Sequence, residues 1–352
     1  PVCDEMMDFF FKVRHFLNMY DCADDKYVTY AELDKDGDML LHLYCVDPSE
    51  NISLRLSQGK ASVMFSATFL PVNYFKEMIS GDISDYAVYA HSPFNTSNKR
   101  VIVGRDVSSR YTRRNINEYT KIADYIRKMV TSRHGRYMIF FPSYSYMQSV
   151  YDIYIKKYEN TILELSAALN DENTAKKGQE QQREQQKEYE GKAVYNIIKQ
   201  PSNMKEADKE SFLSLFMENE KTDIAGFCVL GGIFSEGIDL RGDALIGVAV
   251  VGTGIPMVCR QRNILRDYFD SHGKNGYQYA YVYPGMNKVL QAAGRVIRTD
   301  NDKGIILLLD DRFLTKEYEL QYPREWDKIY PCDAGCVSEY IDDFWKGMTA
   351  DD

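Results

Sequence analysis

The sequence predicts an α/β protein built on a doubly wound parallel β-sheet with flanking helices. Short apolar runs without polar alternation recur from residue 60 onward, as expected for strands that are buried on both faces of a parallel sheet. Helical patterns separate these runs, and such alternation is typical of doubly wound sheets. Polar motifs directly follow several runs, and ligands of such sheets bind beyond the carboxyl ends of the strands.

The predicted strands are seven apolar runs. Helices are expected between them, for example over residues 115–130 and 145–166. The predicted strands cover residues 62–68, 100–106, 136–144, 226–232, 245–252, 279–285 and 304–311.

The first 60 residues have a different pattern. Residues 5–20 are so densely apolar that they predict a helix packed against more than one neighbour. Two β-rich runs follow around Asp36-Gly37, and Asp-Gly between such runs is a strong hairpin signal. An EF-hand loop counted from Asp34 would place Met39 at the glycine position, so we expect a turn here and no calcium or other metal site.

Residues 171–190 interrupt the α/β pattern, because they contain almost no apolar side chains. Gln, Glu and Lys favour helix, but nothing in this segment can bury a face. We therefore expect a solvated helical excursion.

The composition is that of a globular protein, with 44% hydrophobic and 27% charged residues in a chain of 352. The formal net charge of −9 argues against a non-specific polyanion binder but allows a local basic groove for one nucleic-acid strand. The seven cysteines are scattered, and we expect reduced thiols. No apolar run approaches the roughly 20 residues that span a bilayer, and no signal-peptide pattern opens the chain. The start at Pro1 rather than Met suggests either a piece cut from a longer protein or a processed chain.

Residues 289–298, VLQAAGRVIR, contain the clearest functional signal. Gln291, Arg295 and Arg298 recur at spacings of four and three, which would place them on one helical face. Two guanidinium groups can neutralise a transferring phosphoryl group, and the amide can hold a water or an oxygen. Taken alone, a helix with two arginines is more often a solvated face.

Two further motifs follow predicted strands. A glycine-rich turn after strand 226–232 would let the backbone approach a ligand closely, and its carboxylates could orient arginines or a water. An ordinary strand-to-helix connection with acidic N-cap residues would look the same. Ser66 and Thr68 end another predicted strand, where two hydroxyls could relay hydrogen bonds across a domain junction. The polar and glycine residues of the turn are Ser235, Glu236, Gly237 and Asp239.

The order and spacing of these motifs resemble the DinG/XPD family of superfamily-two helicases, especially its bacterial branch. The resemblance extends from about residue 41 to about residue 326. Segments similar to the family's motifs three, four, five and six are, in that order, SAT (66–68), FFPSY (140–144), GGIFSEGIDLRGD (231–243) and QAAGRVIR (291–298).

The resemblance implies a RecA-like, P-loop-NTPase-type fold and the second motor domain of an ATP-dependent DNA helicase. In that family two such domains hold ATP and magnesium between them and move along single-stranded DNA, typically 5′ to 3′. Arg295 and Arg298 match the arginines that reach the phosphates, and Gln291 matches the glutamine of the same motif. The residues that match the family's coupling motifs are Glu236, Gly237, Asp239, Ser66 and Thr68.

Other parts of a complete family member are not found in the sequence. There is no G-x-x-x-x-G-K-[ST] loop, no D-E-A-H box and no four-cysteine spacing for the family's iron–sulfur cluster. The resemblance therefore implies a missing first motor domain, which would bind most of the ATP and Mg²⁺ and would hold any cluster. Residues 1–60 would be the end of an inserted helical region with a lead-in hairpin, and residues 61–352 the second motor domain.

Residues 106–114, DVSSRYTRR, are a candidate DNA-contacting segment. Basic, aromatic and hydroxyl side chains together suit a groove that follows one strand, although an ordinary solvated connection fits the sequence equally well. The candidate DNA contacts are Arg110, Tyr111, Arg113, Arg114, Ser143 and Tyr144.

The expected partners are single-stranded or forked DNA and the missing motor domain of the same protein, and no membrane partner is expected. We expect the protein to be cytoplasmic and associated with the nucleoid. One alternative is a nucleic-acid-binding or docking module that kept the fold and lost the motor; the row of Gln291, Arg295 and Arg298 disfavours it. Another is an RNA helicase, which only substrate competition would distinguish, because 2′-hydroxyl recognition leaves no motif here.

Overall fold

The computed structural model describes residues 4–21, 23–159, 162–164, 195–204, 206–217, 223–232, 234 and 245–349. The chain divides into two compact units, one of Pro1–Tyr89 with Met257–Tyr283 and one of Ala90–Pro256 with Pro284–Asp352. The division falls after Tyr89, so residues 61–89 group with the first unit. The predicted domain boundary after residue 60 refers to the family's division into motor domains and stays a prediction.

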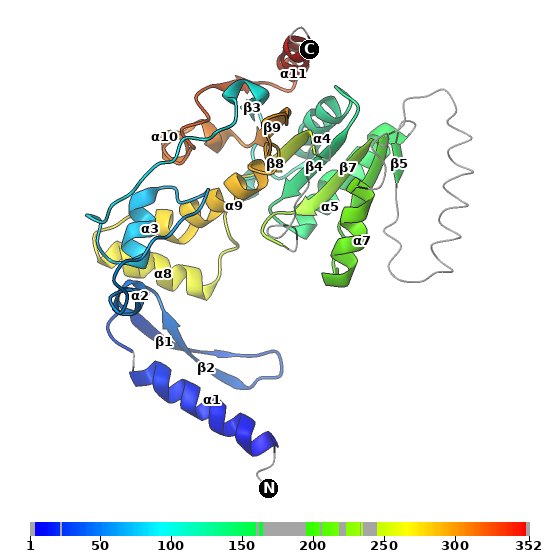
Figure 1. Ribbon diagram of the computed structural model, residues 1–352. Helices are drawn as coiled ribbons and strands as arrows, with labels where there is room; N and C mark the ends of the chain where they lie inside the picture. The colour runs from blue at the N-terminus through cyan, green and yellow to red at the C-terminus, as the bar shows by residue number, and fades with distance from the viewer. Residues whose placement is uncertain are drawn as a thin grey trace. The chain divides into compact units, whose positions relative to one another are not determined.

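The second unit contains the parallel sheet that the sequence predicts (Figure 1). Its described strands are β3 (Lys99–Gly104), β4 (Arg136–Phe141), β5 (Ile162–Glu164), β6 (Tyr195–Lys199), β7 (Ile224–Val229), β8 (Gly247–Val251), β9 (Gly304–Leu309) and β10 (Ile329–Cys332). They form an eight-stranded sheet in the order β10-β3-β9-β8-β4-β7-β6-β5, and every pair is parallel.

The strands form where continuous apolar runs can be buried on both faces. Every residue of β4, β8 and β9 is buried. The predicted strands at 100–106, 136–144, 226–232, 245–252 and 304–311 are therefore confirmed.

Helices cover both faces of this sheet. Ile126 of α4, Tyr154 of α5 and Phe344 of α11 belong to one core with Phe141 and Phe227 of the sheet. On the opposite face, α7 packs closely, because an ideal Cβ on Gly226 would lie 2.7 Å from the Phe216 ring. The helices of this unit are α4 (Ile116–Val130), α5 (Tyr144–Tyr158), α7 (Glu206–Met217), α9 (Tyr283–Ala293), α10 (Lys316–Glu319) and α11 (Val337–Thr349).

The first unit contains the predicted hairpin, β1 (Tyr27–Leu33) and β2 (Met39–Cys45), which pair antiparallel. The Asp34 carboxylate accepts hydrogen bonds from the backbone N–H groups of Asp36 (2.9 Å) and Asp38 (2.8 Å), and Gly37 adopts a φ of 87°. The acidic cluster therefore stabilises a turn. The helices of this unit are α1 (Asp4–Asp21), α2 (Ser49–Leu56), α3 (Val72–Ile79) and α8 (Arg260–Ser271).

Two predicted strands are wrong. Residues 62–68 form no strand, because no described segment pairs with their backbone. The side chains of Val63 and Phe65 are 85% and 90% exposed. Residues 279–285 are helical: Gln278–Val282 is a π-helix that leads into α9. The Asn275 carboxamide accepts a hydrogen bond from the Gln278 N–H (3.2 Å), and a short apolar run alone does not distinguish strand from buried helix.

The helix predicted at residues 5–20 forms as α1, but its expected packing is wrong. None of its residues is buried, and aromatic side chains such as Phe9 and Tyr20 are exposed. The excursion expected at 171–190 lies outside the described residues. The described cysteines are free thiols. Within the described ranges, no helix is long and apolar enough to span a bilayer.

Candidate nucleotide-coupling and nucleic-acid site

Most described candidate residues of the second unit lie just beyond the carboxyl ends of its strands. Arg110 follows β3, Ser143 follows β4 and Gly231 follows β7. Because the strands are parallel, their carboxyl ends meet at one edge of the sheet, the edge where such folds bind ligands.

The predicted helical face formed by Gln291, Arg295 and Arg298 is wrong. Helix α9 ends at Ala293, so only Gln291 lies in it. The N–H groups of Arg295 and Val296 bond three residues back (3.3 Å each), which tightens the last turn. Val296 is buried against Gly304, where an ideal Cβ would lie 2.3 Å from its Cγ1, and this packing directs the chain toward the sheet.

Arg295 and Arg298 nevertheless stay close together. Arg295 is only 5% exposed, and burial and the neighbouring Arg298 charge lower its pKa. The Cys228 thiol of β7 has a smaller effect in the opposite direction. The segment after α9 therefore contains two neighbouring arginines, one of which is buried.

Lys288 is a residue of this site that the sequence analysis did not single out. An ideal Cβ on Gly231 would lie 2.9 Å from the Lys288 Nζ, so Lys288 of α9 lies against the turn after β7. Lys288 and Gln291 are three residues apart and share a face of α9. This spacing is the feature of the sequence that could have identified Lys288 as a site residue.

The backbone around Arg298 is held by one carboxylate. The Oδ2 atom of Asp302 accepts hydrogen bonds from the N–H groups of Arg298 (2.7 Å) and Thr299 (2.8 Å). Its Oδ1 accepts from the Thr299 hydroxyl (2.6 Å). Asp302 is itself buried, so this segment has a defined conformation without being helical.

The remaining coupling candidates lie in the first unit or outside the described residues. In the first unit, the Ser66 and Thr68 hydroxyls lie 3.3 Å apart, and the Thr68 N–H donates to Ser66 Oγ (3.1 Å). Residues Ser235, Glu236, Gly237 and Asp239 lie outside the described residues.

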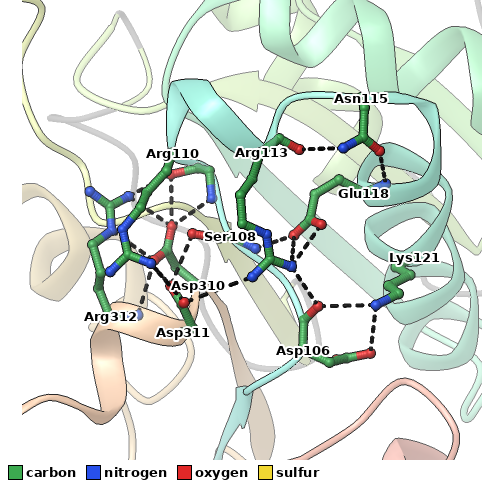
Figure 2. Close-up of polar contacts among 11 residues, drawn as sticks. Asp106, Ser108, Arg110, Arg113, Asn115, Glu118, Lys121, Asp310, Asp311 and Arg312 are labelled. Carbon is green, nitrogen blue, oxygen red and sulfur yellow. Dashed lines mark hydrogen bonds and ion pairs between the residues drawn. The ribbon is translucent and has the colours of Figure 1, made fainter.

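The segment 106–114 is ordered by ion pairs (Figure 2). The Arg110 Nη1 contacts both carboxylate oxygens of Asp311 (3.0 and 2.8 Å), and the Arg113 Nη2 contacts both oxygens of Glu118 (3.2 and 2.9 Å). Asp311 follows β9 and Glu118 lies in α4, so one contact distant in sequence and one local contact hold this loop.

Asp310 lies beneath this loop and is fully buried. It accepts hydrogen bonds from the N–H (2.8 Å) and hydroxyl (2.7 Å) of Ser109 and from the Arg312 guanidinium (2.8 Å). Burial raises the pKa of Asp310, but the Arg312 and Ser109 donors outweigh it and hold the pKa below its usual value.

The other DNA-contact candidates differ in exposure. Tyr111 is 84% exposed. The Tyr144 hydroxyl donates to the carbonyls of Gln200 (2.8 Å) and Pro201, and burial raises the pKa of Tyr144 to about 12. Ser143 caps α5 by accepting from the Tyr146 N–H (3.3 Å).

The fold resembles that of XPD helicases. Two solved XPD structures match with TM-scores of 0.54 and 0.57 at 18% identity, over 90% and 91% of this chain and 50% and 57% of theirs. The class that the fold defines is thus an α/β domain with a doubly wound parallel sheet.

Helicase C-terminal domains match residues 126–329, more than half of the chain, and the chain belongs to this family. The DinG/XPD resemblance is confirmed. A probable ATP-dependent helicase of Methanocaldococcus jannaschii is 26% identical over 63% of the chain and 30% of its own length. A DinG of Staphylococcus saprophyticus, described as a 3′-5′ exonuclease, is 24% identical over 83% of the chain and 28% of its own length. The chain spans about a third or less of these relatives.

Proposed function

We propose that this chain is the second motor domain of an ATP-dependent DNA helicase. In this proposal Arg295 and Arg298, with Gln291, complete the ATP site. The observation that carries it is the pair of neighbouring arginines directly after α9, the helix whose Lys288 lies against the turn after β7, within a helicase C-terminal domain. Guanidinium groups at such a position can neutralise charge on a transferring phosphoryl group.

The triphosphate and Mg²⁺ would be held mainly by a first motor domain outside this chain, which would also contain any iron–sulfur cluster. Two facts support this: the sequence has no phosphate-binding loop of the Walker type, and the matched part of the chain covers only 30% and 28% of the length of the two relatives. Glu236, Gly237 and Asp239 would couple the nucleotide to DNA, with Ser66 and Thr68 acting at the domain junction.

The first unit supports a partner domain of this kind. Val63, Phe65, Tyr86 and Val88 are large apolar side chains that are almost fully exposed. Contiguous exposed apolar surface is costly in water and marks contact sites. We propose that the extended segment 61–66 pairs with the first motor domain of the same protein.

The substrate would be single-stranded or forked DNA, followed 5′ to 3′, in a cytoplasmic, nucleoid-associated protein. A relative from Photobacterium profundum is described as the ATP-dependent DNA helicase DinG; it is 34% identical over 25% of this chain and 13% of its own length. Competition of single-stranded RNA against DNA of the same sequence would distinguish an RNA helicase, because 2′-hydroxyl recognition decides that preference.

ATP hydrolysis with single-stranded DNA tests the proposal. The full-length protein should hydrolyse ATP faster when DNA is added, whereas the 352-residue chain alone should stay well below about 1 per second, a slow working enzyme. DNA binding by a full-length protein without ATP turnover would instead favour a docking module that has lost the motor.

A further inference from the structure

The four basic and aromatic residues of segment 110–114 are not equivalent. Arg110 and Arg113 each pair with a carboxylate, Asp311 and Glu118 respectively. A DNA phosphate would have to displace these carboxylates, and that exchange would bring little net gain in charge neutralisation.

Tyr111 and Arg114 are arranged differently. Among the described residues Arg114 has no carboxylate partner; its Nε donates to the Ser109 carbonyl (3.2 Å). Its guanidinium lies over two rings, 5.6 Å from the centroid of Tyr111 and 5.0 Å from that of Tyr146. The Tyr111 ring is mostly exposed, so an aromatic face and an uncompensated positive charge lie side by side.

We propose that Tyr111 and Arg114 are the pair in this loop that contacts a single DNA strand, Tyr111 by stacking on a base and Arg114 by binding a phosphate. This inference rests on the proposed nucleic-acid function. Base stacking on an aromatic ring beside a cation is the combination that binds single strands without sequence preference. Arg110 and Arg113 stay paired with their carboxylates and do not bind the strand in this proposal.

The position of the pair is determined by the sheet. Asp310, at the end of β9, binds the N–H and hydroxyl of Ser109, and the Ser109 carbonyl in turn binds Arg114. Gly252, after β8, leaves room for this serine, because an ideal Cβ there would lie 2.5 Å from the Ser109 Oγ. The ends of two strands therefore fix the residue that orients Arg114.

The test is binding of the full-length protein to an oligo-dT strand of about 20 nucleotides, long enough to exceed the usual single-domain site size, over a series of salt concentrations. Arg114→Ala should make the slope of log affinity against log salt shallower by about 0.7, the value for one lost phosphate contact on single-stranded DNA. Arg114→Lys should keep the slope. Tyr111→Ala should weaken binding by about 5-fold or more, whereas Tyr111→Phe, which keeps the ring, should bind like the wild type.

Two variants control for charge and for the role of Arg110. Arg105→Ala removes a charge from the same strand end, where Arg105 pairs with the exposed Asp333, and should leave the slope unchanged. The double variant Arg110→Gln with Asp311→Asn removes the ion pair without changing net charge and should also keep the slope. A slope lost in this double variant, or kept in Arg114→Ala, overturns the inference. A wild-type protein that does not bind oligo-dT even at low salt overturns the proposed function as well.

Discussion

At the scale of one residue, substitution of Arg298 tests whether this side chain reaches the phosphates of ATP. In the full-length protein, Arg298→Ala should lower DNA-stimulated ATP turnover by about 10³- to 10⁵-fold, because an arginine that reaches the transferring phosphate acts mainly on the transition state. Arg298→Lys should lose nearly as much, since a point charge does not reproduce the planar fork. Steady-state ATPase assays with saturating DNA measure both.

Arg105→Ala is the matched control for this prediction, because Arg105 is exposed and pairs with Asp333 (2.8 Å). Its turnover should stay near that of the wild type. If a folded Arg298→Ala protein also keeps turnover within a few-fold of wild type, the phosphate-facing role of Arg298 is wrong.

The buried carboxylate of Asp310 should make the stability of the fold depend on pH. Its folded pKa is lowered, so the ionised carboxylate stabilises the fold above the unfolded value of about 3.9, and this contribution is lost as pH falls through the folded pKa. At neutral pH, Asp310→Asn should lower the free energy of unfolding by about 3 kcal/mol or more, because a buried ion pair loses one of its charges.

Urea denaturation at several pH values measures this effect. The difference between wild type and Asp310→Asn should shrink in acid, where the wild-type carboxylate also becomes neutral. Asp267→Asn, in an exposed ion pair with Arg266, is the control and should change stability little. A difference that stays constant through the acid range would contradict the assigned titration.

At the scale of elements, the segment after α9 depends on Asp302. This carboxylate binds the N–H groups of Arg298 and Thr299, on either side of the Arg298 Cα, so its loss should misplace the Arg298 side chain. In the full-length protein, Asp302→Ala should lower kcat for ATP by about 100-fold, the usual cost of a displacement near 1 Å. The KM for ATP should change less, since the first motor domain would hold most of the nucleotide.

Asp302→Asn separates positioning from general folding. The amide oxygen can still accept one or two of these hydrogen bonds, so it should recover part of the lost turnover. Lower thermal stability in Asp302→Ala with an unchanged kcat per folded molecule would mean that Asp302 is only structural.

At the scale of the whole molecule, the exposed segment 61–66 predicts a missing partner. In the 352-residue chain its amides should exchange with solvent rapidly, because the segment belongs to no strand. In the full-length protein they should become protected, since pairing with the first motor domain would satisfy the backbone. Hydrogen exchange read by mass spectrometry measures this. Strand β3 is the internal control and should be protected in both proteins; rapid exchange of 61–66 in both would exclude the pairing.

The sequence by itself determined the parallel sheet, the hairpin and the family. Runs such as 136–141 and 304–309 are apolar at every position but one or two, which is the pattern of strands buried on both faces of a parallel sheet. The turn at Asp36-Gly37 depends on local backbone preferences, and the family on motif order, so neither requires knowledge of distant contacts.

Only the tertiary structure decided where the arginine-bearing helix ends and which arginines are paired. Burial of Val296 against Gly304 ends α9 before Arg295, although the local spacing alone fits one continuous helical face. Arg110 and Asp311 are 201 residues apart in sequence and meet because β3 and β9 are neighbours in the sheet. The spacing of residues along the sequence reflects local backbone preference. Ion pairs such as Arg110–Asp311 depend on strand order instead, because it brings the carboxyl ends of strands that are distant in sequence to one edge of the sheet.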